Sequence, residues 1–277
     1  MAERRDDRSY TYDPVYRHLL RARELSQLND VPQDLKAEIN RAVELLQQRC
    51  LYCEDQSTKP SPALDHLIKE TFAYPWEDAH KEGRVSYYAT PRMLTGNDEA
   101  QLIKLITSAS KANMVLEIGL YTGCSSLAMA EALPKDGKVV SLEIEKGIAD
   151  VARSFLDRSP VGNKIEIMIG PALNSLEILA EKRMKFDVIY IDADKKGYVQ
   201  YYKTIFEKDL LASEGTIIVD NVLKSGDPYS GEKYESNSDA IVEFNDMVLR
   251  DKNVHKVMIP VRDGVYLIRR MEDTDKA

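Results

Sequence analysis

Two hydrophobic patterns divide this chain near residue 111. In the first part, apolar residues such as Leu35, Ile39 and Val43 recur at spacings of three and four, which is typical of amphipathic helices. The predicted helices cover residues 13–28 and 33–50, and two more begin at Ser61 and Asn97. Residues 1–12 are polar and charged, and we expect them to form a loose tail.

After residue 111 the chain changes to short β-rich runs that alternate with helical stretches. The runs cover residues 114–118, 138–143, 164–169, 186–192 and 215–220. The helical stretches between them cover residues 125–133, 147–157, 173–182 and 197–210. Such alternation predicts an α/β fold, in which a parallel sheet carries helices on both faces.

The end of the chain breaks this alternation. A helical stretch over 238–250 precedes two β-rich runs, 254–259 and 265–268, with the turn Arg262-Asp263-Gly264 between them. Two strands so close along the chain can pair only antiparallel. We therefore expect one reversed strand in an otherwise parallel sheet.

Composition excludes several classes of function. The 277 residues carry 38 basic and 46 acidic side chains, a net charge of −8, which disfavours a sequence-independent nucleic-acid binder. We expect no membrane span, because no eighteen apolar residues run together, and no secretory signal. The three cysteines favour a reducing, cytoplasmic compartment. Cys50 and Cys53 form a C-x-x-C pair, which we interpret as structural or incidental because no histidine lies at zinc-finger spacing.

The loops that follow the predicted strands carry the candidate chemistry, because ligands of such sheets bind beyond the carboxyl ends of the strands. In the first loop Gly119 and Gly123 let the backbone approach a bulky ligand, and the spacing departs from G-x-G-x-x-G. Glu117 at that strand end suits a cationic ligand. Glu143 follows Gly123 by twenty residues (143 − 123), where a carboxylate can accept both ribose hydroxyls, and Ala172 leaves space for an adenine ring. Together these residues predict a nucleoside site.

Two later strands end in acidic residues. Asp192 closes the fourth run, and Asp220 and Asn221 close the fifth. If the two strands are neighbours, their spacing of about 4.8 Å brings these side chains within reach of one ion. Oxygen ligands alone favour Mg²⁺, Ca²⁺ or Mn²⁺ over zinc.

Five motifs, in order along the chain, resemble those of the cation-dependent O-methyltransferases typified by caffeoyl-CoA O-methyltransferase, with catechol O-methyltransferase as a more distant relative. They are Glu117-Ile-Gly-Leu-Tyr-Thr-Gly, Gly170-Pro-Ala-Leu, Ile191-Asp-Ala-Asp-Lys, Asp220-Asn and Ile259-Pro-Val-Arg-Asp-Gly. The resemblance implies the Rossmann-like class I methyltransferase fold, with a seven-stranded, mostly parallel sheet and one antiparallel strand. It also implies a methyltransferase domain over 85–277 behind a helical N-terminal extension over 13–84.

The resemblance also implies roles for individual residues. The residues that would contact S-adenosylmethionine are Thr95, Glu117, Gly119, Leu120, Ser125, Glu143, Ala172, Asp192 and Asp194, together with Tyr121, Thr122 and Gly123 of the glycine loop. Asp192, Asp220 and Asn221 would hold Mg²⁺, or Mn²⁺ or Ca²⁺. Met93, Asp192 and Ser225 would lie near the acceptor, and Lys195 matches the family's base. The family has Trp-Asn where this chain has Lys224-Ser225, which leaves the acceptor open.

The implied reaction moves a methyl group from S-adenosylmethionine to a hydroxyl of a vicinal dihydroxy aromatic such as a caffeoyl-CoA, catechol or flavonoid, and leaves S-adenosylhomocysteine. A divalent ion stabilises the oxyanion, and Lys195 takes the proton if its pKa is lowered toward neutrality. Three alternatives remain: a non-catechol acceptor (amino acid, amine or polyketide), a non-catalytic nucleoside-binding protein, and an NAD-dependent oxidoreductase. By analogy with the family we expect a homodimer.

Overall fold

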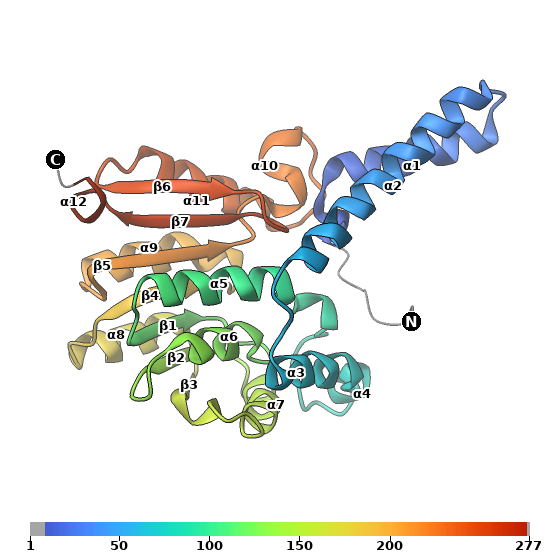
Figure 1. The fold of residues 1–277 in the computed structure, drawn as a ribbon. Coiled ribbons are helices and arrows are strands. Elements are labelled where there is room, and N and C mark those ends of the chain that lie inside the picture. Colours follow the sequence, from blue (N-terminus) through green and yellow to red (C-terminus); the bar gives the residue numbers. More distant parts are fainter. Residues whose placement is uncertain (1–8, 276–277) are drawn as a thin grey trace.

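The β-rich runs form one seven-stranded sheet in the computed structural model, which describes residues 9–275 (Figure 1). Its order is β3-β2-β1-β4-β5-β7-β6. The strands are β1 (Met114–Ile118), β2 (Lys138–Glu143), β3 (Ile165–Ile169), β4 (Phe186–Ile191), β5 (Leu211–Asp220), β6 (Val254–Ile259) and β7 (Val265–Arg270). The strands β1 to β5 all run parallel to one another, and β7 pairs antiparallel with both β5 and β6. The predicted sheet with one reversed strand is confirmed.

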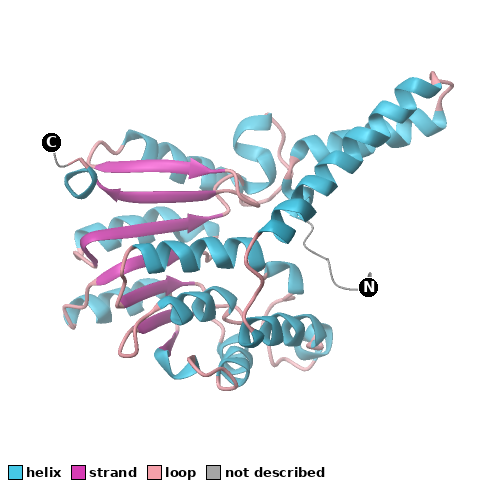
Figure 2. Cartoon of the chain, viewed as in Figure 1, coloured by secondary structure: helices cyan, strands magenta, loops and turns pink. Residues whose placement is uncertain are grey.

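Helices cover both faces of this sheet (Figure 2). They are α1 (Pro14–Leu28), α2 (Gln33–Gln56), α3 (Pro62–Ala73), α4 (Trp76–Lys81), α5 (Asn97–Ala109), α6 (Cys124–Ala132), α7 (Lys146–Leu156), α8 (Ala172–Glu181), α9 (Tyr198–Glu207), α10 (Asp227–Ser230), α11 (Ser238–Arg250) and α12 (Met271–Thr274). Neighbouring strand residues face opposite ways: Val115 belongs to the core under α3–α7, and Leu116 belongs to the core under α8, α9 and α11.

Two of the expected helix starts are capped by side chains, whereas two elements are longer than the pattern indicates. Asp13 caps α1 by accepting the Val15 N–H at 2.9 Å, and Ser61 caps α3. Helix α2 continues to Gln56 instead of ending at residue 50, because its last turns contain no helix breaker before Ser57. Strand β5 begins at Leu211 instead of residue 215, because a register shift in β4 lets its start pair as well.

Helices α1 and α2 form a hairpin, here called the arm (residues 14–56), which projects away from the sheet (Figure 1). Side chains such as Leu28 and Leu35 remain exposed on it. By contrast, Leu64 of α3 and Trp76 of α4 are buried in the core of the sheet. Residues 1–8 of the expected tail lie outside the described residues. No helix within residues 9–275 has the length and apolar content needed to cross a membrane.

A buried polar cluster fixes the junction between β1 and α6. Glu117 accepts hydrogen bonds from the hydroxyls of Ser125 at 2.5 Å, of Ser141 at 2.6 Å and of Ser126. Burial raises the pKa of the Glu117 carboxyl to about 7, although the three serines act in the opposite direction. The carboxyl group thereby joins β1, β2 and the first turn of α6.

We predict that Phe244→Ala destabilises the fold strongly. Phe244 on α11 is fully buried, and its ring lies 5.6 Å from that of Tyr198 and 6.0 Å from that of Tyr202. Removing such a ring leaves a cavity and costs about 3–5 kcal/mol. Urea unfolding measures the loss. The control Leu249→Ala, on an exposed part of the same helix, should cost about 0.5 kcal/mol or less. Equal losses would contradict this packing.

We predict that Glu117→Gln flattens the pH dependence of stability. Because the folded-state pKa is raised from 4.5 to about 7, the folded protein binds more protons than the unfolded chain between these values. The wild-type free energy of unfolding therefore falls as pH rises through this window, by roughly 3 kcal/mol relative to the Gln variant. Urea unfolding of both proteins from pH 4.5 to 8 tests this, and parallel curves would be the opposing result.

Candidate active site

The loops after β1 and β4 touch at the carboxyl edge of the sheet. The Asp192 N–H donates to the Ile118 carbonyl at 2.9 Å. Gly119 has a φ of +100°, and a Cβ atom built there would lie 2.0 Å from the Asp192 carbonyl oxygen. Only glycine combines this backbone conformation with so close an approach. The predicted donor loop and the first predicted metal ligand are therefore brought together.

Two side chains of the glycine loop make contacts within the protein instead of facing a ligand. The Tyr121 hydroxyl donates to the Thr90 carbonyl at 2.9 Å, and its ring stacks on Trp76. Thr122 is fully buried and accepts a hydrogen bond from Thr71 at 2.9 Å. These side chains hold the loop in place, so what the loop offers a ligand here is backbone, with Gly123 at a φ of +88° before α6.

Glu143 ties the end of β2 to the same loop. Its carboxylate accepts the N–H of Tyr121 at 3.1 Å and that of Glu145 at 3.0 Å. Burial raises the pKa of Glu143, and these backbone N–H groups oppose the shift. The Gly170 N–H donates to the Glu143 carbonyl at 2.8 Å, which places the start of α8, at Ala172, beside it.

Strands β4 and β5 are neighbours, so Asp192, Asp220 and Asn221 share one edge. Asp220 is buried, and burial together with the adjacent Asp192 raises its pKa to about 7, while Lys195 opposes the shift. Two carboxylates at adjacent strand ends, followed by Asn221, offer an oxygen-only donor set that fits a hard divalent cation. Within residues 9–275 no group of three His, Cys, Asp or Glu side chains is arranged to hold a metal ion, so an ion here needs the Asn221 amide or water.

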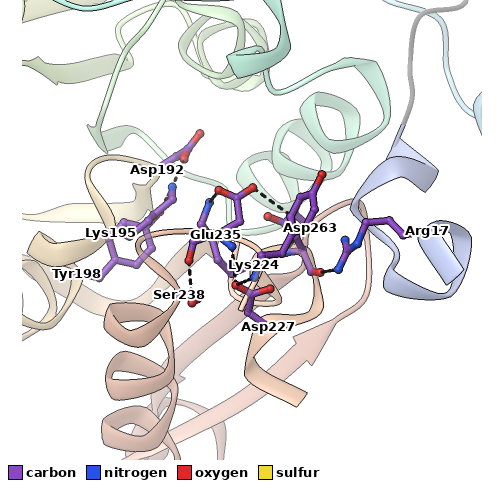
Figure 3. Close-up of polar contacts among 11 residues, drawn as sticks. Arg17, Asp192, Lys195, Tyr198, Lys224, Asp227, Glu235, Ser238 and Asp263 are labelled. Atoms are coloured by element: carbon purple, nitrogen blue, oxygen red, sulfur yellow. Dashed lines mark hydrogen bonds and ion pairs between the residues drawn. The ribbon is translucent and has the colours of Figure 1, made fainter. Parts of the chain in front are cut away.

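Lys195 bridges this edge to α9 (Figure 3). Its Nζ donates to Asp192 Oδ1 at 2.9 Å and to the Tyr198 hydroxyl at 2.7 Å. The Tyr198 hydroxyl donates in turn to the Asp220 carbonyl at 3.2 Å. Burial acts to lower the pKa of Lys195, but Asp192, Tyr198 and Asp220 outweigh it, and the pKa is raised. In this arrangement the neighbouring carboxylates therefore hold the proton on the amine. The pKa near neutrality that a base role requires stays a prediction for the site with an ion bound.

Three residues of the site escaped the sequence reasoning. Glu99, in the first turn of α5, is buried, and its Oε2 lies 3.4 Å from Arg262 Nε. The Tyr190 hydroxyl lies 3.4 Å from both Glu99 Oε1 and Asp220 Oδ2. Burial and Asp220 raise the pKa of Glu99 well above its usual value, and Arg262 opposes them. From sequence, an acidic residue in a first helical turn indicates a favourable interaction with the helix end. Only the tertiary contacts of Glu99 with Arg262 and Tyr190 show that it belongs to the site.

The remaining predicted residues lie around the same edge. Thr95 is buried just before α5, and Met93 is exposed in a 3₁₀ turn (Pro91–Met93). Asp194 accepts from the Tyr201 hydroxyl at 2.5 Å. Ser225 lies buried in the loop after β5, where its N–H donates to Asp263 Oδ1 at 2.6 Å.

Two surface cavities, of about 580 and 450 Å³, border α7 instead of this edge. Residues such as Arg84, Asp150 and Arg158 line them, and neither is lined by Asp192, Asp220 or Lys195. Size alone does not mark the candidate site; the convergence of charged side chains at the strand ends does.

Comparisons with known proteins agree with this geometry. Caffeoyl-CoA O-methyltransferase of Petroselinum crispum is 35% identical over 228 residues, which cover 78% of this chain and 94% of that protein. Caffeoyl-CoA O-methyltransferase 1 of Arabidopsis thaliana is 33% identical and covers 78% of this chain, which spans 87% of that protein.

Solved structures are similar as well. The SAH-bound methyltransferase PaMTH1 of Podospora anserina superimposes with a TM-score of 0.71 at 27% identity, over 82% of this chain and 95% of that one. The O-methyltransferase TomG of Streptomyces achromogenes, in complex with SAM, gives 0.66 at 25% identity over 79% and 94%. A family model described as O-methyltransferase matches residues 54–271. The chain therefore belongs to the O-methyltransferase family, as an S-adenosylmethionine-dependent enzyme of the caffeoyl-CoA O-methyltransferase type.

Proposed function

We propose that this enzyme uses a divalent cation to methylate one hydroxyl of a vicinal dihydroxy aromatic small molecule. The observation that carries the proposal is the pair of carboxylates, Asp192 and Asp220, at the ends of adjacent strands, with Lys195 bonded to the first. Binding a nucleoside alone requires no such pair. The curated relatives whose names specify caffeoyl-CoA as acceptor support an aromatic hydroxyl as the nucleophile.

S-adenosylmethionine is proposed to lie over the glycine loop. The backbone of Gly119 and Leu120 is proposed to contact it, together with Ser125 in the first turn of α6 and Glu117 in β1, which are hydrogen-bonded to each other. Glu143, at the end of β2, is proposed to accept the ribose hydroxyls. The sulfonium and amino groups of the donor are cationic, which suits the buried acidic residues at this edge. Thr95, Ala172 and Asp194 are proposed to complete this site around the loop.

Asp192, Asp220 and Asn221 are proposed to hold Mg²⁺, or Mn²⁺ or Ca²⁺. When bound, such an ion supplies Lewis-acid stabilisation of the acceptor oxygen. Its charge would also offset the two carboxylates that raise the pKa of Lys195, and so favour the neutral amine. The fit rests on the donor set: two carboxylates and one amide oxygen, with no soft ligand.

Lys195 is proposed to take the proton of the reacting hydroxyl. The acceptor oxygen then attacks the methyl carbon, the carbon–sulfur bond breaks with its electron pair going to sulfur, and an aryl methyl ether and S-adenosylhomocysteine remain. The Tyr198 hydroxyl, 2.7 Å from Nζ, holds the amine toward the site. The rest of catalysis is alignment of oxygen, carbon and sulfur, which a rigid strand edge provides.

The acceptor pocket is proposed to lie between Met93, Asp192 and the loop that contains Ser225. That loop departs from the family at Lys224-Ser225, so the ring substituents accepted here are proposed to differ from those of the plant relatives. We further propose a methyltransferase domain over 85–277 behind the extension of 13–84, and a homodimer in a reducing, cytoplasmic compartment.

We predict that Asp220→Ala abolishes metal-stimulated methylation while the fold persists. Removing one carboxylate takes away a ligand and leaves Asp192 alone, so turnover of a catechol with Mg²⁺ should fall at least about 100-fold. Affinity for S-adenosylhomocysteine, measured by calorimetry, should stay within about threefold. Asp246→Ala, a surface carboxylate on α11, is the matched control. Full turnover in the variant, or in wild-type enzyme with excess EDTA, would refute the metal role.

We predict that Lys195→Met lowers the rate of methyl transfer by about 10²–10⁴-fold, because it removes the group proposed to take the proton. Methionine keeps the apolar stem in the buried site, so affinity for S-adenosylhomocysteine should change little. Single-turnover kinetics with saturating Mg²⁺ measure the step directly. Lys196→Met changes the exposed neighbour and should behave as wild type. A loss of less than about threefold at position 195 would show that the amine is dispensable.

A further inference from the structure

The N-terminal segment before and in α1 docks against the loop that follows β5 (Figure 3). Arg17 Nη2 donates to the Ser225 carbonyl at 2.8 Å, and its guanidinium lies 4.2 Å from the ring centre of Tyr234. A Cβ atom built on Gly226 would lie 2.5 Å from Pro14 Cγ, so the two backbones approach closely. These contacts join positions about 200 residues apart, and they all fall beside the proposed acceptor pocket.

The loop held in this way is strained. After β5, Asn221, Lys224 and Ser225 have φ values of 60°, 39° and 55°, in the left-handed region that non-glycine residues rarely adopt. Such conformations persist only where neighbouring groups fix them. Arg17 fixes the Ser225 carbonyl from one side, and Asp263 fixes the Ser225 N–H from the other at 2.6 Å.

Tyr12 brings an aromatic ring to the same edge. It ends the 3₁₀ turn η1 (Ser9–Tyr12), and its ring centre lies 5.8 Å from Arg262 Cζ. Arg262 in turn contacts Glu99, which the Tyr190 hydroxyl links to Asp220. Burial raises the pKa of Tyr12. Arg262 opposes this shift, and the carboxylates of Asp263, Asp220 and Glu99 add to it. Tyr12 is therefore linked to the proposed metal ligand Asp220 through a series of contacts that runs from Arg262 by way of Glu99 and Tyr190.

We propose that residues 12–17 form one wall of the acceptor pocket, in which the Tyr12 ring packs against the aromatic acceptor and Arg17 positions the loop after β5. This inference rests on the proposed function and specifies it further: the wall favours a compact dihydroxylated ring over one with a long substituent. Tyr12 touches the acceptor, whereas Arg17 acts through Ser225 and is a positioning residue.

The wall belongs to this chain and not to the family core. The family model matches residues 54–271, so Tyr12 and Arg17 lie outside it. The loop that they contact holds Lys224 and Ser225, where the sequence departs from the family pattern. A segment outside the family core thus meets a divergent loop at one place, which is where acceptor choice is expected to differ among enzymes that share a donor site.

The experiment uses full-length protein with two acceptors, 4-nitrocatechol as the compact ring and caffeoyl-CoA as the extended one. Binding of 4-nitrocatechol is followed by its absorbance in the presence of S-adenosylhomocysteine and Mg²⁺, where no turnover occurs. For Tyr12→Ala we expect the dissociation constant to rise about tenfold, because an aromatic contact is lost. Tyr12→Phe should keep wild-type binding. The ratio of kcat/KM for caffeoyl-CoA over 4-nitrocatechol should rise by a similar factor in Tyr12→Ala.

Arg17→Ala provides a second, independent variant. We expect KM for 4-nitrocatechol to rise several-fold while kcat stays within about threefold, because the loop loses an anchor and the reacting groups stay in place. Tyr52→Ala, an exposed tyrosine on the arm, is the matched control and should leave binding and selectivity unchanged. Stabilisation by S-adenosylhomocysteine in a thermal melt confirms that each variant is folded.

The outcomes separate the two proposals. If wild-type enzyme binds 4-nitrocatechol and Tyr12→Ala and Arg17→Ala bind it equally well with unchanged selectivity, the wall is overturned and the proposed function stands. If wild-type enzyme binds S-adenosylhomocysteine but neither binds nor methylates a catechol with Mg²⁺, the proposed function falls, and the wall falls with it.

Discussion

Two carboxylates that repel each other, those of Asp192 and Asp220, are held at the ends of adjacent strands, and the rest of the site follows from that constraint. In a buried place such a pair requires positive charge or protons nearby. The structure supplies the ammonium of Lys195 at 2.9 Å and raises the pKa of Asp220. A cationic donor and a divalent ion, both proposed here, would meet the same electrostatic demand. The acidity of this edge is therefore consistent with the positive ligands proposed for it.

Backbone geometry makes this concentration of charge possible. Gly119 lets the loop after β1 lie directly against the carbonyl of Asp192, and the Glu117 cluster fixes where that loop enters α6. The carboxylate of Glu143 is satisfied by two backbone N–H groups of the loops that it joins. Glu117 and Glu143 therefore each have a structural role beside the one proposed for them in donor binding. This is why variants here need a donor-binding measurement beside the rate.

The sequence could predict what is local or repeats with a period. Alternating strands and helices predicted the parallel sheet, and the break in that alternation near the end of the chain predicted its reversed strand. The acidic ends of two runs predicted that Asp192 and Asp220 share one edge, because neighbouring parallel strands present their ends together. It could not predict Glu99, Tyr12 or Arg17, whose surroundings come from elements distant in the chain. Nor could it give the direction of the Lys195 pKa, because burial and neighbouring carboxylates act in opposite senses and only their distances decide between them.

The core and the arm contribute differently to the proposed site. The donor loops and the acidic strand ends lie within the sheet, where packing on both faces allows little variation. The loop after β5 is strained and is held from outside, by Arg17 of α1 and by Asp263 of the last turn. Because its conformation depends on these anchors, a change in the anchoring segment would alter the proposed acceptor pocket and leave the donor loops in place. Under the proposed function, acceptor choice in this enzyme is therefore set by a contact between the arm and the core, at the one edge where reactive oxygen, methyl carbon and charge have to meet.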